Sequence, residues 1–201
     1  RMVVIYNGVE PARFAAPALA ASVREEFAVP AGAGLAVHVA RFDPEKNHAG
    51  LLRILTALVT LRRDVVLLLV GDGPLRARVQ AAAEASGLGP WIRFAGARDD
   101  VPRLLAAADV FVFPSLWEGL PGAVLEALAT GLPVVASPLP GVLEIARHAG
   151  GIVTADPADP AAFAQRVLDA LAARATVPRR PALPPVFTTA AAMERTLACY
   201  A

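Results

Sequence analysis

Apolar and polar positions along the chain follow two different periods. Seven short segments rich in Val, Ile, Leu and Phe carry apolar residues at consecutive positions, which is typical of buried strands. These predicted strands cover residues 2–6, 35–40, 65–70, 91–95, 110–113, 133–136 and 151–154. Between them, apolar residues recur three and four positions apart, as in Leu51, Leu55 and Leu58, and this period predicts amphipathic helices. The predicted helices cover residues 17–27, 47–61, 74–86, 101–107, 121–130, 141–146 and 160–173.

Strands that are apolar on both faces and alternate with helices indicate a parallel sheet covered on both sides. We therefore expect an α/β fold, a doubly wound Rossmann-like sheet, over residues 1–175. The proline-rich residues 176–187 predict a linker, and residues 188–201 a C-terminal helix. The chain begins with Arg1 rather than Met and runs directly into a strand-like segment, so we expect a fragment or a processed chain.

Charge and cysteine content narrow the function classes. A net charge of +1, from 19 basic and 18 acidic residues, supplies no basic surface for nucleic acid and no polybasic membrane patch. The one cysteine, Cys199, excludes an internal disulfide and a cysteine zinc site. The three histidines (His38, His48 and His148) lack metal-ligand spacing, so they predict no metal site. The longest strongly apolar segments are far shorter than the roughly 20 residues that span a bilayer.

The first candidate for chemistry follows the predicted strand at residues 35–40. Arg41 lies at the carboxyl end of that strand, where doubly wound folds bind ligands. Lys46, the only lysine among the 19 basic residues, lies where the next helix begins. Two cations beside a helix N-terminus suit an anion with several oxygens, such as a diphosphate. The alternative is a solvated loop with surface charges.

The second candidate covers residues 115–127. Glu118 precedes a predicted helix and Glu126 lies inside it, while Gly119 and Gly122 let backbone N–H groups approach a ligand closely. The helix N-terminus is a second anion site. A ribose diol is a natural donor pair for the carboxylate of Glu126, and hydroxyls of a second sugar suit Glu118. The alternative is that neither glutamate binds a ligand. Glu118 would then be an acidic residue favoured near the helix N-terminus by the helix dipole, and Glu126 an exposed residue within the helix.

Seven residues separate Glu118 from Glu126, and the surrounding string, residues 113–137, resembles the Glu-x7-Glu signature of the family-4 retaining glycosyltransferases. These enzymes have the two-domain GT-B fold. Further segments match the family in its order, at residues 5–9, 41–46, 70–74, 94–96 and 108–115. The resemblance covers residues 2–173, with Ala40 standing where the family usually has glycine.

The resemblance implies a role for each matching residue. Arg41 and Lys46 would hold the diphosphate of a nucleotide sugar and neutralise the leaving group, as catalytic groups together with Glu118. Glu118 would contact the donor sugar and Glu126 the ribose hydroxyls. The remaining donor contacts implied are the backbones of Gly119, Leu120, Gly122 and Ala123, with the main chain of Arg98 against the base.

The resemblance therefore implies the donor domain of a hexosyltransferase that transfers from an NDP-hexose with retention, without a metal ion and with no cofactor besides this donor substrate. A UDP-sugar is favoured, and the acceptor is a saccharide or a lipid-linked sugar, as in polysaccharide biosynthesis. The family's N-terminal acceptor domain has no counterpart in this chain, so we expect the fragment alone to be inactive. For the full-length enzyme we expect a cytoplasmic location or peripheral association with the inner face of the membrane. Two alternatives stay open: a nucleotide-sugar epimerase of the same fold, and a non-catalytic nucleotide-binding module.

Overall fold

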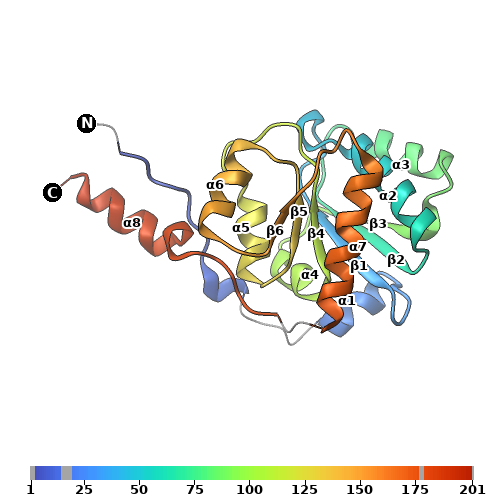
Figure 1. Cartoon of the computed structure of the whole chain (residues 1–201), viewed down its shortest axis with the longest axis horizontal. Coiled ribbons are helices and arrows are strands. Elements are labelled where there is room, and N and C mark those ends of the chain that lie inside the picture. Colours follow the sequence, from blue (N-terminus) through green and yellow to red (C-terminus); the bar gives the residue numbers. More distant parts are fainter. Residues whose placement is uncertain (1–2, 15–19, 177–178, 201) are drawn as a thin grey trace.

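The computed structural model describes residues 3–14, 20–176 and 179–200. Six parallel strands form one sheet in the order β3-β2-β1-β4-β5-β6, as Figure 1 shows. They are β1 (Gly34–Val39), β2 (Val65–Val70), β3 (Ile92–Gly96), β4 (Val110–Phe113), β5 (Val134–Ala136) and β6 (Ile152–Thr154). The six strands predicted between residues 35 and 154 are confirmed, and their observed bounds differ from the predicted ones by at most one residue.

Helices cover both faces of the sheet. One face packs against α1 (Ala20–Glu26), α4 (Val101–Ala107), α5 (Gly122–Ala129) and α6 (Pro140–His148). The other face packs against α2 (His48–Leu61), α3 (Arg76–Ala85) and α7 (Pro160–Thr176). The remaining elements are α8 (Thr189–Ala198) and the 3-10 turns η1 (Pro11–Phe14), η2 (Pro44–Lys46), η3 (Gly89–Trp91) and η4 (Pro185–Phe187). This arrangement confirms the doubly wound α/β fold.

The two hydrophobic cores explain why the strands are apolar at consecutive positions. In β2, Val66 and Leu68 point into the core on the α5 side, whereas Leu67 and Leu69 point into the core on the α2 side. All six residues of this strand are buried. Because neighbouring side chains of a strand point to opposite faces, a sheet with a core on each face needs an apolar residue at every position.

The order of the strands creates a crevice between β1 and β4. The chain builds β1, β2 and β3 outward in one direction and then returns to place β4 on the other side of β1. The loop after β1 leads to α2 on one face, and the loop after β4 leads to α5 on the opposite face. In open α/β sheets, ligands bind at such a switch point, beyond the carboxyl ends of the strands.

The strand predicted at residues 2–6 is wrong over residues 3–6, and Met2 lies outside the described residues. Residues 3–8 have no regular secondary structure, and the side chains of Val3 and Val4 are exposed (56% and 63%). Tyr6 contacts the body through its side chain, which donates to Glu144 Oε1 at 2.5 Å, and the first backbone bridge in the described residues joins Val9 to Thr188, next to α8. An apolar segment becomes a strand only where a neighbouring strand accepts its hydrogen bonds, and that partner cannot be deduced from periodicity.

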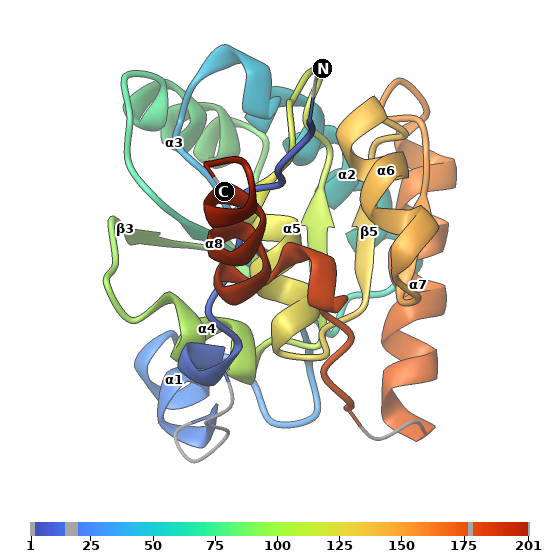
Figure 2. The same ribbon diagram turned by 90° about the vertical axis from the view of Figure 1, so that its left-hand side faces the viewer.

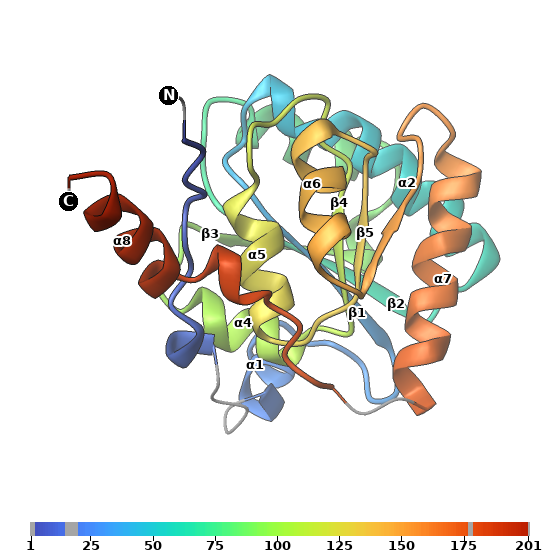
Figure 3. The same cartoon turned by 60° about the vertical axis from the view of Figure 1, so that its left-hand side comes forward.

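The two terminal segments leave the body at the same place, as Figures 2 and 3 show. Met193, Leu197 and Tyr200 on the last turns of the chain are exposed. Before α8, the described part of the proline-rich segment lies against the body: Ala182 donates its N–H to the carbonyl of Leu128. Residues 177–178 of the predicted linker and residue 201 of the predicted helix lie outside the described residues. Among the helices that the structure describes, none is both long and apolar enough to cross a bilayer.

Candidate functional site

Lys46 and Glu118 meet at the crevice. The ammonium of Lys46, at the end of η2, donates to Glu118 Oε1 at 2.5 Å. Both side chains are largely shielded from water, with 20% and 14% of their surface exposed. A shielded ion pair has to be well placed, because each charge loses hydration that its partner must replace. The structure therefore places the two candidate segments of the sequence, residues 41–46 and 115–127, in contact with each other.

The loop after β1 is held by the turn after β2. The N–H of Phe42 donates to the carbonyl of Asp72. Gly71 and Gly73 stand directly behind this loop in conformations with φ of +134° and +155°, and a Cβ atom on Gly71 would lie 2.0 Å from the carbonyl oxygen of Ala40. Glycine is required there by both the backbone angle and the close approach. The predicted strand at residues 65–70 and the predicted helix at residues 74–86 leave these glycines only as a connection, and no sequence signal showed that they fix the loop after β1.

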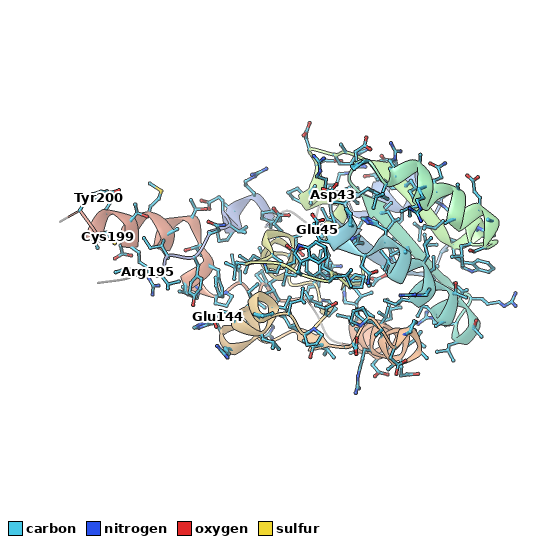
Figure 4. The ribbon with its side chains drawn as sticks, turned by 90° about the horizontal axis from the view of Figure 1, so that it is seen from above. Asp43, Glu45, Glu144, Arg195, Cys199 and Tyr200 are labelled. Carbon is cyan, nitrogen blue, oxygen red and sulfur yellow. The ribbon has the colours of Figure 1, made fainter. Side chains whose placement is uncertain are left out.

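The side chain of Arg41 extends from that loop into solvent. It is 70% exposed and pairs with Asp43 at 2.7 Å. Figure 4 looks down on this edge of the sheet, with Asp43 and Glu45 over the body and Arg195, Cys199 and Tyr200 far away on the terminal helix. A long exposed side chain loses little by exchanging one carboxylate partner for another anion. Arg41 is therefore free to reorient toward a ligand in the crevice.

The N-terminus of α5 faces the same crevice. Within the described residues, its N-cap, Pro121, makes no side-chain cap hydrogen bond. The first N–H groups of a helix have no partner inside the helix, so these groups are available to an anion. A Cβ atom added at Gly119 or Gly122 would meet open space. From behind, Gly141 of α6 presses against this loop, since a Cβ there would lie 1.6 Å from the carbonyl oxygen of Gly119.

These elements enclose a pocket of about 350 Å³ at the carboxyl ends of β1 and β4. The pocket joins five of the predicted site residues, Arg41, Lys46, Glu118, Gly122 and Ala123. It is lined in addition by Val39, Ala40, Asp43, Glu45, Phe113 and Pro121. Two cations, three carboxylates and a helix N-terminus at one pocket suit a polar ligand that carries both phosphate and hydroxyl groups.

The other predicted site residues lie outside this lining. Glu126 is half-buried on α5, one turn beyond Gly122. Burial raises the pKa of its carboxyl group, and the guanidinium of Arg13 opposes that rise only in part. Gly119 is exposed and Leu120 packs against the core on the α5 side. The fold therefore solvates the charged form of the Glu126 carboxylate less well than water does.

Arg98 follows β3, two strands away from β1. Its guanidinium donates to both carboxylate oxygens of Asp100 and to Glu26, and it lies 6.0 Å from the ring of Phe27. The side chain is therefore used within the protein, and only the main chain of Arg98 stays available to a ligand.

Two buried histidines lie beneath the loop after β1. His38 Nδ1 contacts the carbonyl oxygen of Val112 at 2.8 Å, and the ring of His48 stacks on Phe42 with centroids 4.0 Å apart. Burial lowers the pKa of His38 to about 3 and that of His48 to about 4, and the nearby charge of Lys46 adds to both effects. Both rings are therefore neutral at pH 7. Among the residues that the structure describes, no three His, Cys, Asp or Glu side chains are grouped closely enough to hold a metal ion.

Comparison with known proteins identifies the family. A family model described as "Glycosyl transferases group 1" matches residues 33–173, which include both loops of the pocket. The chain belongs to the group 1 glycosyl transferases. The resemblance noted at the Glu-x7-Glu string is thus confirmed for the family.

Two curated relatives illustrate the match. The 2-deoxystreptamine glucosyltransferase of Streptomyces kanamyceticus is 33% identical over 173 residues, which are 83% of this chain and 45% of that protein. The UDP-Gal:alpha-D-GlcNAc-diphosphoundecaprenol alpha-1,3-galactosyltransferase of Escherichia coli is 34% identical over 142 residues, 69% of this chain and 37% of that protein. The chain thus spans less than half the length of either relative.

Solved structures agree with the fold of a group 1 enzyme. HepE of Anabaena in complex with UDP and glucose superposes with a TM-score of 0.80 at 23% identity, over 98% of this chain and 56% of HepE. The sucrose-phosphate synthase of Thermosynechococcus elongatus gives a TM-score of 0.79 at 26% identity, over 98% of this chain and 51% of that chain. The chain has the fold of one half of these GT-B enzymes.

Proposed function

We propose that this chain is the donor domain of a retaining hexosyltransferase and binds a nucleoside-diphosphate sugar in the pocket between β1 and β4. The observation that carries the proposal is the shielded contact between Lys46 and Glu118 at the uncapped N-terminus of α5. The name of the galactosyltransferase relative and the ligands of the HepE structure, UDP and glucose, support a UDP-sugar as the donor. The proposed acceptor is a saccharide or a lipid-linked sugar.

The ion pair suggests how the donor enters. In the free protein, Lys46 neutralises Glu118. A diphosphate carries more charge than one carboxylate, so its arrival draws the ammonium of Lys46 away from Glu118. Glu118 is then left with unused lone pairs beside the pocket, and sugar hydroxyl groups supply the hydrogen bonds that it loses. Binding of the diphosphate and recognition of the sugar are thereby coupled through one exchange of partners.

The same groups account for departure of the diphosphate. Cleavage of the bond between the anomeric carbon and the leaving oxygen places negative charge on the diphosphate. Lys46, Arg41 and the first N–H groups of α5 stabilise that charge in a partly dry pocket, where such interactions are strongest. We propose that they act in place of a divalent ion. Glu126, one turn along α5, is the proposed partner of the ribose hydroxyl groups, and the main chain of Arg98 the proposed neighbour of the base.

Thermal unfolding of the chain with UDP, GDP, ADP, UDP-glucose and NADH, in buffer with EDTA, tests the donor site. A nucleoside diphosphate at 100 times its Kd adds about 2.7 kcal/mol to the free energy of unfolding. We expect stabilisation by UDP and UDP-glucose. Lys46→Ala and Glu126→Ala should abolish it, and Arg53→Ala, on the exposed side of α2, should not. Stabilisation by NADH alone, or equal stabilisation of all four proteins, contradicts the proposal.

Product analysis on a full-length enzyme that contains this domain separates the proposed reaction from its alternatives. A glycoside that keeps the donor's anomeric configuration, formed in the presence of EDTA, supports the proposal. A 2-epimer of the donor sugar identifies an epimerase of the same fold instead. Tight nucleotide binding with neither product identifies a non-catalytic module.

A further inference from the structure

The pocket is assembled from two loops that the sheet itself does not join. The ladder between β1 and β4 pairs Ala36 with Val110 and Val37 with Phe111, and the loops begin beyond it. The Lys46–Glu118 contact joins side chains at the tips of these loops. Their backbones therefore need other connections to keep the two charged groups opposite each other.

Two hydrogen bonds supply those connections. The N–H of Leu116 donates to the carbonyl oxygen of Glu45 at 2.8 Å, and the side-chain amide of Asn47 donates through Nδ2 to the carbonyl oxygen of Pro114 at 3.0 Å. The first bond joins two backbone groups, so it does not depend on which side chains stand at these positions. The second depends on one side chain, directly after Lys46.

The local backbone allows few residue types at position 47. Asn47 has φ 55° and ψ 42°, the left-handed region that asparagine tolerates better than most side chains. Its backbone N–H donates to the carbonyl of Pro44, and its Oδ1 accepts from the N–H of Gly50 at 3.1 Å, which caps α2. The amide group thus uses its acceptor to begin the helix and its donor to hold the opposite loop.

No close substitute performs both tasks. Glycine keeps the left-handed backbone and loses both side-chain bonds. Aspartate keeps the cap of α2 but has no donor for Pro114, against which it places a carboxylate oxygen. Gly50 leaves room for the amide, since a Cβ there would lie 2.4 Å from Asn47 Nδ2.

We propose that Asn47 is a positioning residue of the donor site: its amide ties the loop after β1 to the loop after β4 and so holds Lys46 opposite Glu118. This proposal for Asn47 rests on the proposed function only in holding that the pocket binds a diphosphate. Fixing a lysine side chain costs rotamer entropy, and a loop that is already held in place spares the complex the further cost of ordering its backbone. Asn47 acts through Lys46 and touches no ligand itself.

The side-chain ammonium of Lys46 gives a test that needs no ligand. Because the chain has one lysine, an NMR spectrum of lysine ammonium groups contains a single signal. We expect this signal in the wild type, where Glu118 slows exchange of its protons with water, and its loss by exchange broadening in Asn47→Gly. Asp159→Gly is the matched control, because it removes the Asp159–Ala162 cap of α7 and leaves the pocket unchanged. A sharp signal in both variants overturns the proposal.

Ligand binding gives the second test, by titration calorimetry with UDP and UMP. We expect Asn47→Gly and Asn47→Asp to weaken UDP binding about 5-fold and UMP binding less than about 2-fold, since one lost hydrogen bond of this kind is worth about 1 kcal/mol and acts on the diphosphate. Asp159→Gly should match the wild type for both ligands. Equal losses for UDP and UMP, or losses that Asp159→Gly shares, indicate a purely structural role and overturn the proposal. If the wild type binds no nucleoside diphosphate, the proposed function fails, and the ammonium signal still decides the role of Asn47.

Discussion

The loop after β1 and the loop after β4 line one pocket but are built by opposite means. The loop after β1 supplies cations, and the helix that follows it is capped by Asn47. The loop after β4 supplies a carboxylate, and the helix that follows it begins at Gly122, after an N-cap, Pro121, that makes no side-chain cap hydrogen bond among the described residues. Helix N–H groups are therefore available to a ligand on the side that lacks basic side chains. The two loops thus supply positive potential by different means: the loop after β1 through basic side chains, and the loop after β4 through the N-terminus of α5.

A glycine of a neighbouring element also packs closely against each loop, on the side away from the pocket. Gly71 stands behind the loop after β1, and Gly141 behind the loop after β4. Gly119 and Gly122, by contrast, face open space on the pocket side. Glycine thus has two uses at this site, to let protein segments approach each other and to leave room in front of the helix.

The substitution with the largest expected effect on stability is one that disturbs the close approach behind the loop after β1. Gly71→Ala places a Cβ against the carbonyl of Ala40 in a backbone conformation that alanine disfavours, and we expect a loss of about 3 kcal/mol in the free energy of unfolding. Gly87→Ala is the control, with a positive φ but open space around it, and should cost about 1 kcal/mol. Urea unfolding measures both. Equal losses would mean that the close approach behind the loop has no energetic weight.

The sheet shows which parts of this architecture can be predicted from sequence. The residues of β2 have to be apolar on both faces, so a parallel sheet covered on both sides could be predicted with nearly correct strand bounds. Residues 3–6 have a similar composition but no neighbouring strand, and they form none. Periodicity reports burial, whereas strand pairing depends on contacts between distant parts of the chain.

For the candidate site, residue types could be singled out from the sequence, but the geometry that brings them together could not. The isolated lysine at position 46 and the glutamates on either side of the α5 N-terminus could be singled out from residue type and place. That Lys46 contacts Glu118 depends on β4 lying beside β1, which the order of elements along the chain does not fix. The bond from Asn47 to Pro114 spans 67 residues, and its only trace in the sequence is that asparagine occurs at just two positions.

The next effect concerns the histidines beneath the loop after β1. Burial lowers the pKa of His48 to about 4, against 6.5 in an unfolded chain, so the unfolded state takes up a proton first as the pH falls. Stability is therefore complete above pH 6.5 and falls toward pH 4, by about 1.4 kcal/mol per pH unit for each such histidine. His38 behaves alike from a lower pKa of about 3.

His48→Phe keeps the stacking on Phe42 and removes one of the two contributions. Between pH 7 and pH 5 we expect the wild type to lose about 4 kcal/mol of unfolding free energy and the variant about half of that. Urea unfolding at the two pH values measures the difference. Identical pH dependences for the two proteins would show that His48 is not held neutral by its surroundings.

A smaller effect distinguishes the second use of glycine. Gly122→Ala adds a methyl group at the first position of α5, where it meets open space, and should raise the free energy of unfolding by about 0.5 kcal/mol. The same methyl group stands in front of the helix N-terminus, and we expect it to weaken UDP binding about 5-fold or more. Gly89→Ala, also in open space but far along the chain from the pocket, should leave binding unchanged. Unchanged UDP affinity in Gly122→Ala would remove the α5 N-terminus from the proposed site.

The smallest effect tests whether the fold holds a carboxylate in α5 at a cost. Burial raises the pKa of Glu126, so the folded state favours its protonated form and loses stability as the pH rises through the range in which the unfolded carboxyl ionises. Glu126→Gln resembles the protonated form. We expect it to be slightly more stable than the wild type at pH 7, by less than about 0.5 kcal/mol, and equally stable at pH 4. Chemical unfolding at both pH values measures this difference, with Glu84→Gln, an exposed position on α3, as the control.

A gain in stability at pH 7 together with a loss of UDP binding would mark Glu126 as a group kept for a ligand, because the packing of α5 alone favours an uncharged side chain there. A loss of stability at pH 7 would instead assign Glu126 to the support of the helix.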